Sequence, residues 1–354
     1  MKILTINPGS TSTKIAIYDD ELLSYKKSIR HNTELINSFD RIFDQYQLRE
    51  KAILDTLKEA DISLESFDAI VGRGGMLKPI EGGTYKVNQN MIDYVQAAPR
   101  GEHASNLGCV LAKELADQIG VDAFIVDPVA VDEMEDIARF TGMPGIKRQS
   151  LFHALNQKAV SLKAATELKK NYNELNLIVT HLGGGISVGV HKKGKVIDVN
   201  NALDGDGPMS PERSGGVPIG PLYKMALSGD YNLKEIKRMN YGNGGMVAYL
   251  GTNDGFEIEK RINDGDEFAK FILEVMCYQI SKEIGSAATV LKGKVDAVVL
   301  TGGLAYDKMI IELIKERVSF IGNVLVFPGE DEMEALAFGG LRVLRGQEIA
   351  KVYE

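Results

Sequence analysis

The segment INPGSTSTK, residues 6–14, has the residue types of a phosphate-binding loop but not the usual spacing. A Walker A loop needs G-x-x-x-x-G-K-[ST] ahead of a helix, whereas here Gly9 is followed by four hydroxyl residues and Lys14, without a second glycine. Apolar residues then repeat with a period of two, at Ile15 and Ile17, which is typical of a strand. The segment is therefore predicted to be a turn between two strands, and its backbone N–H groups and hydroxyls suit a phosphate.

A second glycine-rich turn, HLGGGIS at residues 181–187, offers similar groups. Glycines let a backbone approach an anion closely, and hydroxyl or lysine side chains add hydrogen bonds and charge. Tight hairpins alone would use the same residue types, but the occurrence of two such turns at corresponding positions favours phosphate binding. The candidate contacts are Ser10, Ser12, Lys14, Gly183, Gly184 and Gly185.

The sequence around each turn repeats along the chain, about 175 residues apart. Both copies read as three short strands, then an apolar strand that ends in glycines, then another apolar strand. The paired segments are 2–28 with 176–200, 67–75 with 295–303, and 122–128 with 323–329. Helical periodicity over 40–60 and 266–291 lies between them. The chain is thus predicted to contain two copies of one mixed α/β unit.

The two predicted domains are residues 1–150 and 151–330. The last helix, predicted over 331–346, is expected to pack back on the first domain, so that about 331–354 belong to it. A pseudo-twofold arrangement would face the two turns toward one polyanion across a cleft between the domains.

Composition excludes several classes of protein. The chain has 354 residues, 44% of them hydrophobic and 25% charged, which is typical of a globular protein with two cores. A net charge of −8 without a basic run argues against nucleic-acid binding. Two distant cysteines provide neither a disulfide framework nor a metal motif, and no apolar run approaches a membrane span. We therefore expect a cytoplasmic protein with no membrane or nucleic-acid partner.

Three motifs together carry a resemblance to a known family. INPGSTSTK, VTHLGGGISVG and NALDGDGPMSPERSGG resemble the acetate and butyrate kinase family, within the actin, hexokinase and heat-shock-chaperone ATPase superfamily. The resemblance covers essentially the whole chain. It implies an α/β fold of duplicated ribonuclease-H-like, actin-like ATPase domains, each a mixed five-stranded sheet flanked by helices, with the active site in the cleft between them.

The resemblance implies a reversible transfer of phosphate from ATP, with Mg²⁺, to a short-chain acid such as butyrate or isobutyrate. A carboxylate acceptor is already deprotonated at pH 7, so the reaction needs charge neutralisation and in-line positioning rather than a general base. Arg73 follows a predicted strand and Arg213 lies in a loop bounded by proline and glycine. By resemblance, these two arginines hold the acyl carboxylate and the transferring phosphoryl group.

Asp127 ends a predicted strand just before Pro128, at the sheet edge where α/β proteins place their chemistry, so it is predicted to act near Mg²⁺. The resemblance implies that Glu332 is also near the metal, although Glu334 competes with it. It also places His153 and His181 near the phosphoryl group, where an imidazole N–H donates to an oxygen. His103 is a third candidate, or a helix cap.

By the same resemblance, Asn7 binds near the phosphate and substrate oxygens, and Gly302 and Gly303 let adenosine lie against the backbone. Gly74 and Gly75 are expected to leave room beside Arg73 for an acid longer than acetate. The expected partners are ATP or ADP, the carboxylic acid and further copies of the chain, as a dimer or larger homo-oligomer.

Three alternative functions are open at this point. An acetate or propionate kinase would share every motif. A sugar kinase of this fold would need a carboxylate base, and an actin-like ATPase switch protein would have no use for converging arginines.

Overall fold

The computed structural model describes residues 1–354, and its internal contacts divide the chain into two units. Unit 1 comprises Met1–Asp132 and Asp331–Glu354, and unit 2 comprises Glu133–Glu330. The structure thus divides the chain before residue 150, because segment 133–150 pairs with a strand of unit 2. In that segment Glu135 N donates to Ile197 O at 2.9 Å, and Arg148 Nη1 lies 2.8 Å from Asp198 Oδ1.

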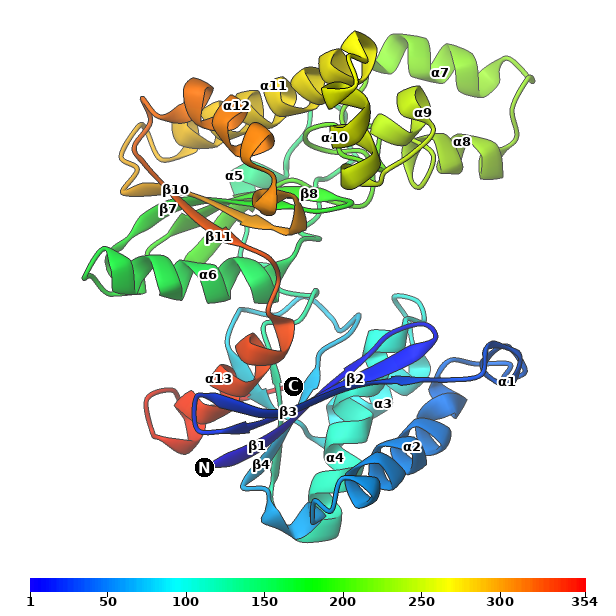
Figure 1. The fold of residues 1–354 in the computed structure, drawn as a ribbon, viewed down its shortest axis with the longest axis vertical. Helices are drawn as coiled ribbons and strands as arrows, with labels where there is room; N and C mark the ends of the chain where they lie inside the picture. Colours follow the sequence, from blue (N-terminus) through cyan, green and yellow to red (C-terminus); the bar gives the residue numbers. More distant parts are fainter. The chain divides into compact units, whose positions relative to one another are not determined.

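Unit 1 is built on a seven-stranded sheet with the order β12-β5-β6-β4-β1-β2-β3 (Figure 1). Its strands are β1 Lys2–Pro8, β2 Ser12–Asp19, β3 Leu22–Arg30, β4 Ala69–Arg73, β5 Thr84–Lys86, β6 Asp122–Val126 and β12 Lys351–Val352. β1, β4 and β6 are parallel, while β1-β2-β3 form an antiparallel meander. The prediction of five strands was wrong for this unit, because β5 and β12 extend the β6 edge.

Helices cover both faces of this sheet. They are α1 Thr33–Asn37, α2 Tyr46–Glu59, α3 Gln89–Ala97, α4 Leu107–Ile119 and α13 Glu332–Leu344, with short 3₁₀ turns η1 Phe43–Gln45, η2 Leu64–Ser66 and η3 Ala104–Asn106. Leu4, Ile6 and Ile15 pack in one core with Leu111 of α4. On the other face α13 lies against β1, β4 and β6, and Asp331–Glu354 belong to unit 1.

Unit 2 contains a five-stranded sheet with the order β11-β10-β7-β8-β9, which matches β6-β4-β1-β2-β3 of unit 1. Its strands are β7 Asn176–Leu182, β8 Ile186–Lys192, β9 Lys195–Val199, β10 Ala297–Gly302 and β11 Asn323–Pro328. In both sheets three strands form a meander and two more run parallel to the first. The predicted duplication is therefore visible in the strand order.

The helices of unit 2 also lie on both faces of its sheet. They are α5 Asp136–Arg139, α6 Ala154–Glu167, α7 Ile219–Leu227, α8 Leu233–Asn240, α9 Met246–Leu250, α10 Gly255–Asn263, α11 Glu267–Val290 and α12 Lys308–Val318, with 3₁₀ turns η4 Tyr172–Glu174 and η5 Gly303–Tyr306. Within β7, Leu177 and Val179 pack toward α6, whereas Ile178 belongs to the core beneath α11 and α12. This alternation is the period of two expected for a strand covered on both faces.

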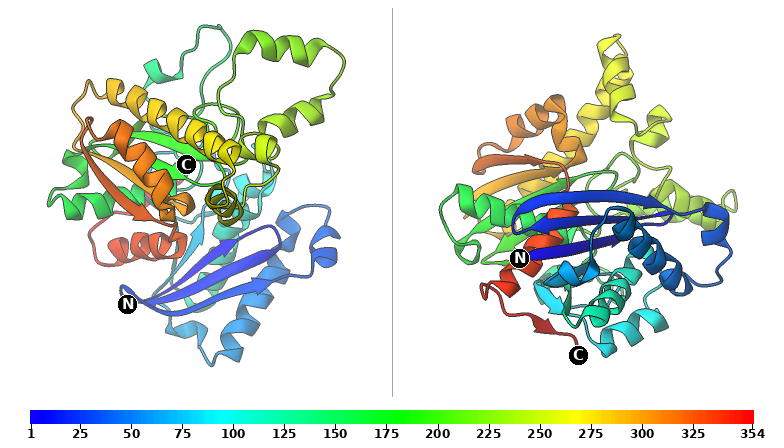
Figure 2. Two further views of the ribbon diagram at one scale, coloured as in Figure 1. Left: turned by 45° about the horizontal axis from the view of Figure 1, so that its top comes forward. Right: turned by 60° about the horizontal axis from the view of Figure 1, so that its bottom comes forward.

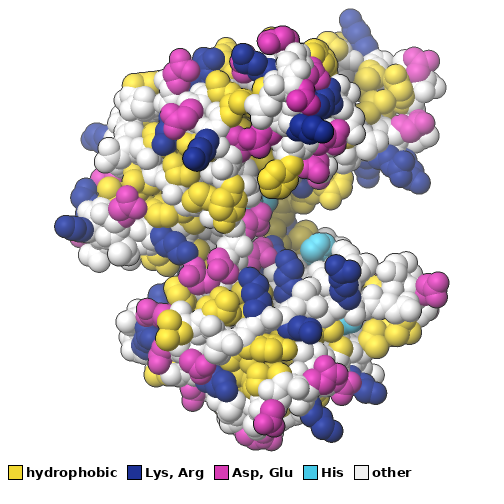
Figure 3. All heavy atoms as spheres, viewed as in Figure 1, with side chains coloured by type: hydrophobic (Ala, Val, Ile, Leu, Met, Phe, Trp, Pro, Cys, Tyr) yellow, Lys and Arg dark blue, Asp and Glu magenta, His cyan; other side chains and the backbone are white.

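Helices α7 and α8 project from the rest of unit 2 (Figure 2). Neither helix buries a residue within the chain. The space-filling view shows hydrophobic side chains on this hairpin among lysines and arginines (Figure 3). None of the helices combines the length and the apolar character that crossing a membrane requires.

Close contact between α4 and β4 fixes the end of the strand that carries Arg73. A Cβ atom on Gly72 would lie 1.9 Å from Gly108 O, and one on Gly108 would lie 2.1 Å from Arg73 O. Only glycine fits at either position, because the obstructing atoms belong to the backbone.

We expect Gly108→Ala to lower the free energy of unfolding by about 1–3 kcal/mol, the usual cost of overpacking. Gly285→Ala is the matched control, because this glycine lies inside α11 with nothing within 4 Å of its added Cβ. That change should raise stability by about 0.5–1 kcal/mol through helix propensity. Urea denaturation of both variants measures the effects, and equal stability of Gly108→Ala and wild type would contradict the close packing.

Candidate active site

The carboxyl ends of three adjacent parallel strands bring predicted site residues together in unit 1. Asn7 lies at the end of β1, Arg73 ends β4, and Asp127 directly follows β6. The register pairs Ile6 with Gly72, so Asn7 and Arg73 are neighbours at one edge of the sheet. This is the edge at which open α/β sheets bind their ligands.

Glu332, in the first turn of α13, contacts two of these residues. Its carboxylate lies 2.6 Å from Arg73 Nη1 and accepts from Asn7 Nδ2 at 2.6 Å. Glu334 instead donates its backbone N–H to the N-cap residue Asp331. Glu332 thus contacts the strand ends of unit 1.

Asp127 is held in an unusual backbone conformation. Its φ is 37°, in the left-handed region that non-glycine residues rarely occupy, and its side chain is buried. Oδ1 accepts from Gly83 N at 2.7 Å, and Asp127 N donates to Gly83 O at 3.1 Å. Strained residues of this kind persist where the surroundings hold them, which is common at functional sites.

The first glycine-rich turn is organised by a residue that the sequence analysis did not identify. Arg49 of α2 is fully buried and donates to Gly9 O at 2.9 Å, Ser10 O at 3.0 Å and Ser12 O at 3.1 Å. In a planar trans peptide the N–H points opposite to the C=O, so the N–H groups of Ser10 and Thr11 point away from Arg49. The guanidinium thereby orients the turn, while Ser10 and Lys14 stay exposed.

A signal for Arg49 does exist in the sequence. It lies four residues before Ile53 and eight before Leu57, on the buried stripe of α2, where a lone cation is out of place. Burial lowers the pKa of Arg49 to about 10, so it remains charged at neutral pH. His31 also contacts this region, with Nε2 2.8 Å from Thr13 Oγ1.

We expect Arg49→Met to lower the free energy of unfolding by about 2–4 kcal/mol, because several carbonyls lose their donor. Arg49→Lys keeps the charge but loses the planar guanidinium. Its free energy of unfolding should lie between those of Arg49→Met and the wild type. Lys51→Met, at an exposed position of the same helix, is the control and should change stability by less than about 0.5 kcal/mol. Thermal and urea unfolding measure all three, and a wild-type stability for Arg49→Met would refute the role of the guanidinium.

In unit 2 the two predicted histidines lie against each other. The rings of His153 and His181 are stacked, with centroids 3.7 Å apart and an interplanar angle of 10°. His153 precedes α6 and contacts Ser187 Oγ through Nδ1 at 2.9 Å. His181, near the end of β7, contacts Asn156 Oδ1 through Nδ1 at 2.7 Å and lies 3.5 Å from Glu330 Oε1 through Nε2.

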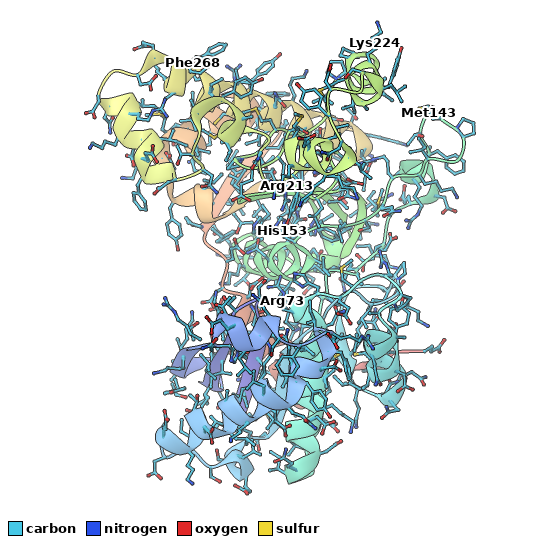
Figure 4. The ribbon with its side chains drawn as sticks, turned by 90° about the vertical axis from the view of Figure 1, so that its right-hand side faces the viewer. Arg73, Met143, His153, Arg213, Lys224 and Phe268 are labelled. Carbon is cyan, nitrogen blue, oxygen red and sulfur yellow. The ribbon has the colours of Figure 1, made fainter.

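Arg213, labelled in Figure 4, contacts the second glycine-rich turn at Gly185. A Cβ on Gly185 would be 1.6 Å from Arg213 Nη1, so glycine is needed there to admit the guanidinium. Gly184 O accepts from Ser210 Oγ at 2.7 Å and from Glu212 N at 3.2 Å, which ties the turn to the loop that carries Arg213.

The guanidinium of Arg213 is itself partly desolvated. Nη1 donates to Ala202 O, Cζ lies 5.2 Å from the ring of Tyr241, and buried Nε has no partner in the protein. Burial lowers the pKa of Arg213, although a guanidinium stays charged at neutral pH. A buried donor without a partner is costly unless something else accepts from it.

Beside η5 lies a pocket of about 340 Å³, lined largely by apolar side chains from α9, α10, α11 and α12. Gly303 lines it, together with Leu304, Ile258 and Met309. Gly302 has φ 90°, and its added Cβ would lie 2.3 Å from Leu182 O. Gly302 therefore serves the contact between β10 and β7, and Gly303 is the glycine that faces the pocket.

The expected space beside Gly75 is absent. A Cβ there would lie 2.6 Å from Asn106 Cα, and one on Gly74 would lie 2.5 Å from Pro128 Cβ. The prediction that these glycines open room for a longer acid was wrong, because both are packed against neighbouring chain. His103 forms the N-cap of η3, where Nδ1 accepts from Ser105 N at 3.2 Å.

The predicted metal residues Asp127 and Glu332 belong to the same unit but do not form a cage. No three or more His, Cys, Asp or Glu side chains gather so as to hold a metal ion. The carboxylates at the strand ends of unit 1 fit a different mode of metal binding. In that mode Mg²⁺ is bound by one or two protein oxygens, and water and phosphate oxygens complete its coordination shell.

Two solved kinases share this fold. Acetate kinase from Porphyromonas gingivalis is 21% identical, with a TM-score of 0.78 over 97% of this chain and 99% of that chain. A propionate kinase from Francisella tularensis subsp. tularensis SCHU S4 is 22% identical, with a TM-score of 0.70 over 95% and 98% of the two chains. The chain thus has the two-unit α/β fold of these two proteins.

Sequence relatives narrow this class. Residues 138–332 match the model of the Acetokinase family. The chain is also 53% identical over 353 residues to Butyrate kinase 2 of Clostridium acetobutylicum, covering 100% of this chain and 99% of that one. The chain belongs to the acetate and butyrate kinase family and is a short-chain carboxylate kinase, a class that uses ATP as a substrate.

Proposed function

We propose that this chain phosphorylates butyrate, and branched acids of similar size such as isobutyrate, with ATP and Mg²⁺ in a reversible reaction. The observation that carries the choice of acid is the 53% identity, over the full chain, to a protein named Butyrate kinase 2. A carboxylate oxygen of the acid attacks the γ-phosphorus, the bond to the β–γ bridging oxygen breaks, and ADP leaves. No general base is required, because the attacking oxygen carries no proton.

We propose that Arg73 and Arg213 neutralise the acyl carboxylate and the transferring phosphoryl group. Arg73 lies at a ligand-binding sheet edge with its guanidinium held by Glu332, and Arg213 presents a buried Nε–H without a protein acceptor. A planar guanidinium donates two parallel hydrogen bonds to either anion. Asn7 lies next to Arg73 and contacts the same carboxylate, so it is placed to bind substrate oxygens beside it.

The two glycine-rich turns are the proposed phosphate contacts. In the first, the N–H groups of Ser10 and Thr11 face away from Arg49, and Ser10, Ser12 and Lys14 add polar groups. In the second, Gly183, Gly184 and Gly185 adjoin His181 and Arg213. His153 and His181 are proposed to donate N–H groups to phosphoryl oxygens, which stabilises charge that develops during transfer.

Asp127 and Glu332 are the proposed protein ligands of Mg²⁺. Both present carboxylate oxygens near the strand ends of unit 1, and one or two such groups suffice for Mg²⁺ in phosphoryl-transfer sites. A bound Mg²⁺ would neutralise negative charge on the phosphates of ATP. The pocket lined by Gly303 has the apolar character that an adenosine ring requires.

We also propose that the chain forms a homo-oligomer in the cytoplasm. Helix α7 exposes 61% of Ile219 and 82% of Leu227, and α8 exposes 68% of Leu233. Contiguous exposed apolar side chains commonly mark an interface, and light scattering of the purified protein measures the mass. The buried free cysteines Cys109 and Cys277 are compatible with a reducing compartment.

The reaction is tested by incubating the protein with ATP, Mg²⁺, hydroxylamine and one of four acids: acetate, propionate, butyrate or isobutyrate. Acyl phosphate is trapped as hydroxamate, and we expect butyrate to exceed acetate by roughly tenfold in kcat/KM. Each buried methylene contributes about 0.8 kcal/mol, and butyrate has two more than acetate. A preference for acetate would refute the proposed acid, and ATP hydrolysis without hydroxamate would refute the kinase reaction.

We expect Arg73→Ala and Arg213→Ala to lose about 10²–10³-fold in kcat while keeping ATP affinity, because each removes a charged donor. Arg317→Ala is the control, since this arginine is exposed on α12 and lies over the ring of Tyr278. Hydroxamate formation gives kcat, and calorimetry gives ATP affinity. Wild-type turnover in either active-site variant would overturn the assignment of that arginine.

A further inference from the structure

A buried chain of hydrogen-bonding side chains in unit 2 ends at His153. Tyr172 OH lies 2.7 Å from His191 Nδ1, and His191 Nε2 lies 3.0 Å from Gln157 Oε1. Gln157 Nε2 then lies 2.9 Å from Ser187 Oγ, which lies 2.9 Å from His153 Nδ1. Gln157, Ser187 and His191 have no exposed surface, so these contacts decide where the protons lie.

The spacing of residues along α6 and along β8 brings these hydrogen-bonded side chains together. His153, Gln157 and Ser161 follow one another at intervals of four along α6 and the residue that precedes it. On β8, Ser187, Gly189 and His191 alternate onto one face. A Cβ on Gly189 would lie 2.2 Å from Gln157 Oε1, so the glycine makes room for the amide.

The orientation of the Gln157 amide is fixed by the backbone. Its Nε2 lies 3.1 Å from the carbonyl oxygen of Ser187, which only accepts hydrogen bonds. The NH₂ group must therefore face Ser187, and Oε1 must accept from His191 Nε2. Burial and the Lys158 ammonium hold the pKa of His191 well below its usual range, so this ring is neutral, and its Nδ1 accepts from Tyr172 OH.

The remaining proton lies on Ser187. Its Oγ accepts from Gln157 Nε2, and the acceptor left for its own O–H is His153 Nδ1. The reverse direction would leave a buried hydroxyl proton without an acceptor, at a cost of about 1–3 kcal/mol. We propose that Gln157 and Ser187 are positioning residues that fix neutral His153 with its proton on Nε2.

In the stacked partner His181 it is Nδ1 that carries a proton. Asn156 Nδ2 lies 3.5 Å from Gly329 O, an acceptor only, so Asn156 Oδ1 faces His181 and accepts from Nδ1–H at 2.7 Å. The consequence for catalysis rests on the proposed function: His153 donates an N–H to a phosphoryl oxygen without taking up a proton. The tautomer itself does not depend on that function.

The test is a long-range ¹H–¹⁵N imidazole spectrum of the full chain without substrate, in which five histidines are resolved by single substitutions. We expect wild-type His153 to show Nε2–H only, with Nδ1 shifted as a hydrogen-bond acceptor. Ser187→Ala should abolish that shift. Gln157→Leu should add a population with the proton on Nδ1, because Ser187 Oγ loses its donor and the bond to His153 can reverse.

Two further variants separate this effect from loss of fold. Gly189→Ala keeps every polar group but displaces the Gln157 amide, and should reproduce the spectrum of Gln157→Leu. Ser161→Ala is the matched control: Ser161 Oγ lies 3.1 Å from His191 Nδ1, but Tyr172 still donates there, so His153 should be unchanged. Urea denaturation confirms that each variant is folded.

A wild-type His153 with its proton on Nδ1 would overturn the proposal, as would the same His153 signals in wild type, Ser187→Ala and Gln157→Leu. In the hydroxamate assay, Gln157→Leu and Gly189→Ala should lose about tenfold or more in kcat, since outer partners that orient a functional histidine typically contribute this much. If the variants change the tautomer of His153 but not kcat, the proposed tautomer stands. The proposed role of His153 in phosphoryl transfer would then be wrong.

Discussion

The ion pair between Arg73 and Glu332 is the constraint on which the strand ends of unit 1 depend. It joins β4 to the first turn of α13, and its two residues are 259 positions apart in the chain, at an Nη1–Oε1 distance of 2.6 Å. The same carboxylate holds Asn7, so three elements are aligned by one group. A bound anion at Arg73 must compete with Glu332, and a cation near Glu332 would weaken its hold on the guanidinium. If the acid binds Arg73 and Mg²⁺ binds Glu332, as proposed above, their binding is coupled through this one side chain.

Much of the fold follows from local pattern. The two meanders, the strands that end at Arg73 and Gly302, and the helices α2, α11 and α13 were predicted because alternation and helical periodicity are local properties. The edge strand β12 was not, since two residues carry no periodic signal. The domain boundary was placed too late because segment 133–150 is held by hydrogen bonds to β9, which depend on tertiary contacts.

The candidate site likewise contains some residues that the local sequence indicates and others that only tertiary contacts reveal. The groups that we expect to contact ligand could be named from the sequence because polar residues at glycine turns and strand ends stand out there, and their role in binding stays a prediction. Arg49 was missed because one charge in an apolar stripe is weak evidence until its partners are known, and those partners are carbonyls that no sequence displays. Gly75 was misread as open space because glycine also marks close packing, here against Asn106.

The discontinuity of unit 1 also orders events during synthesis. Helix α13 covers one face of the first sheet, where Gly339 meets Val126 and Gly340 meets Val71. The ribosome must first make the whole of Glu133–Glu330, which at about 5–20 residues per second takes roughly 10–40 s. During that interval the nascent sheet exposes an apolar face, and unit 2, continuous in sequence, is free to complete its own core first. The core of unit 1 can therefore be completed only after the last helix, α13, has been synthesised.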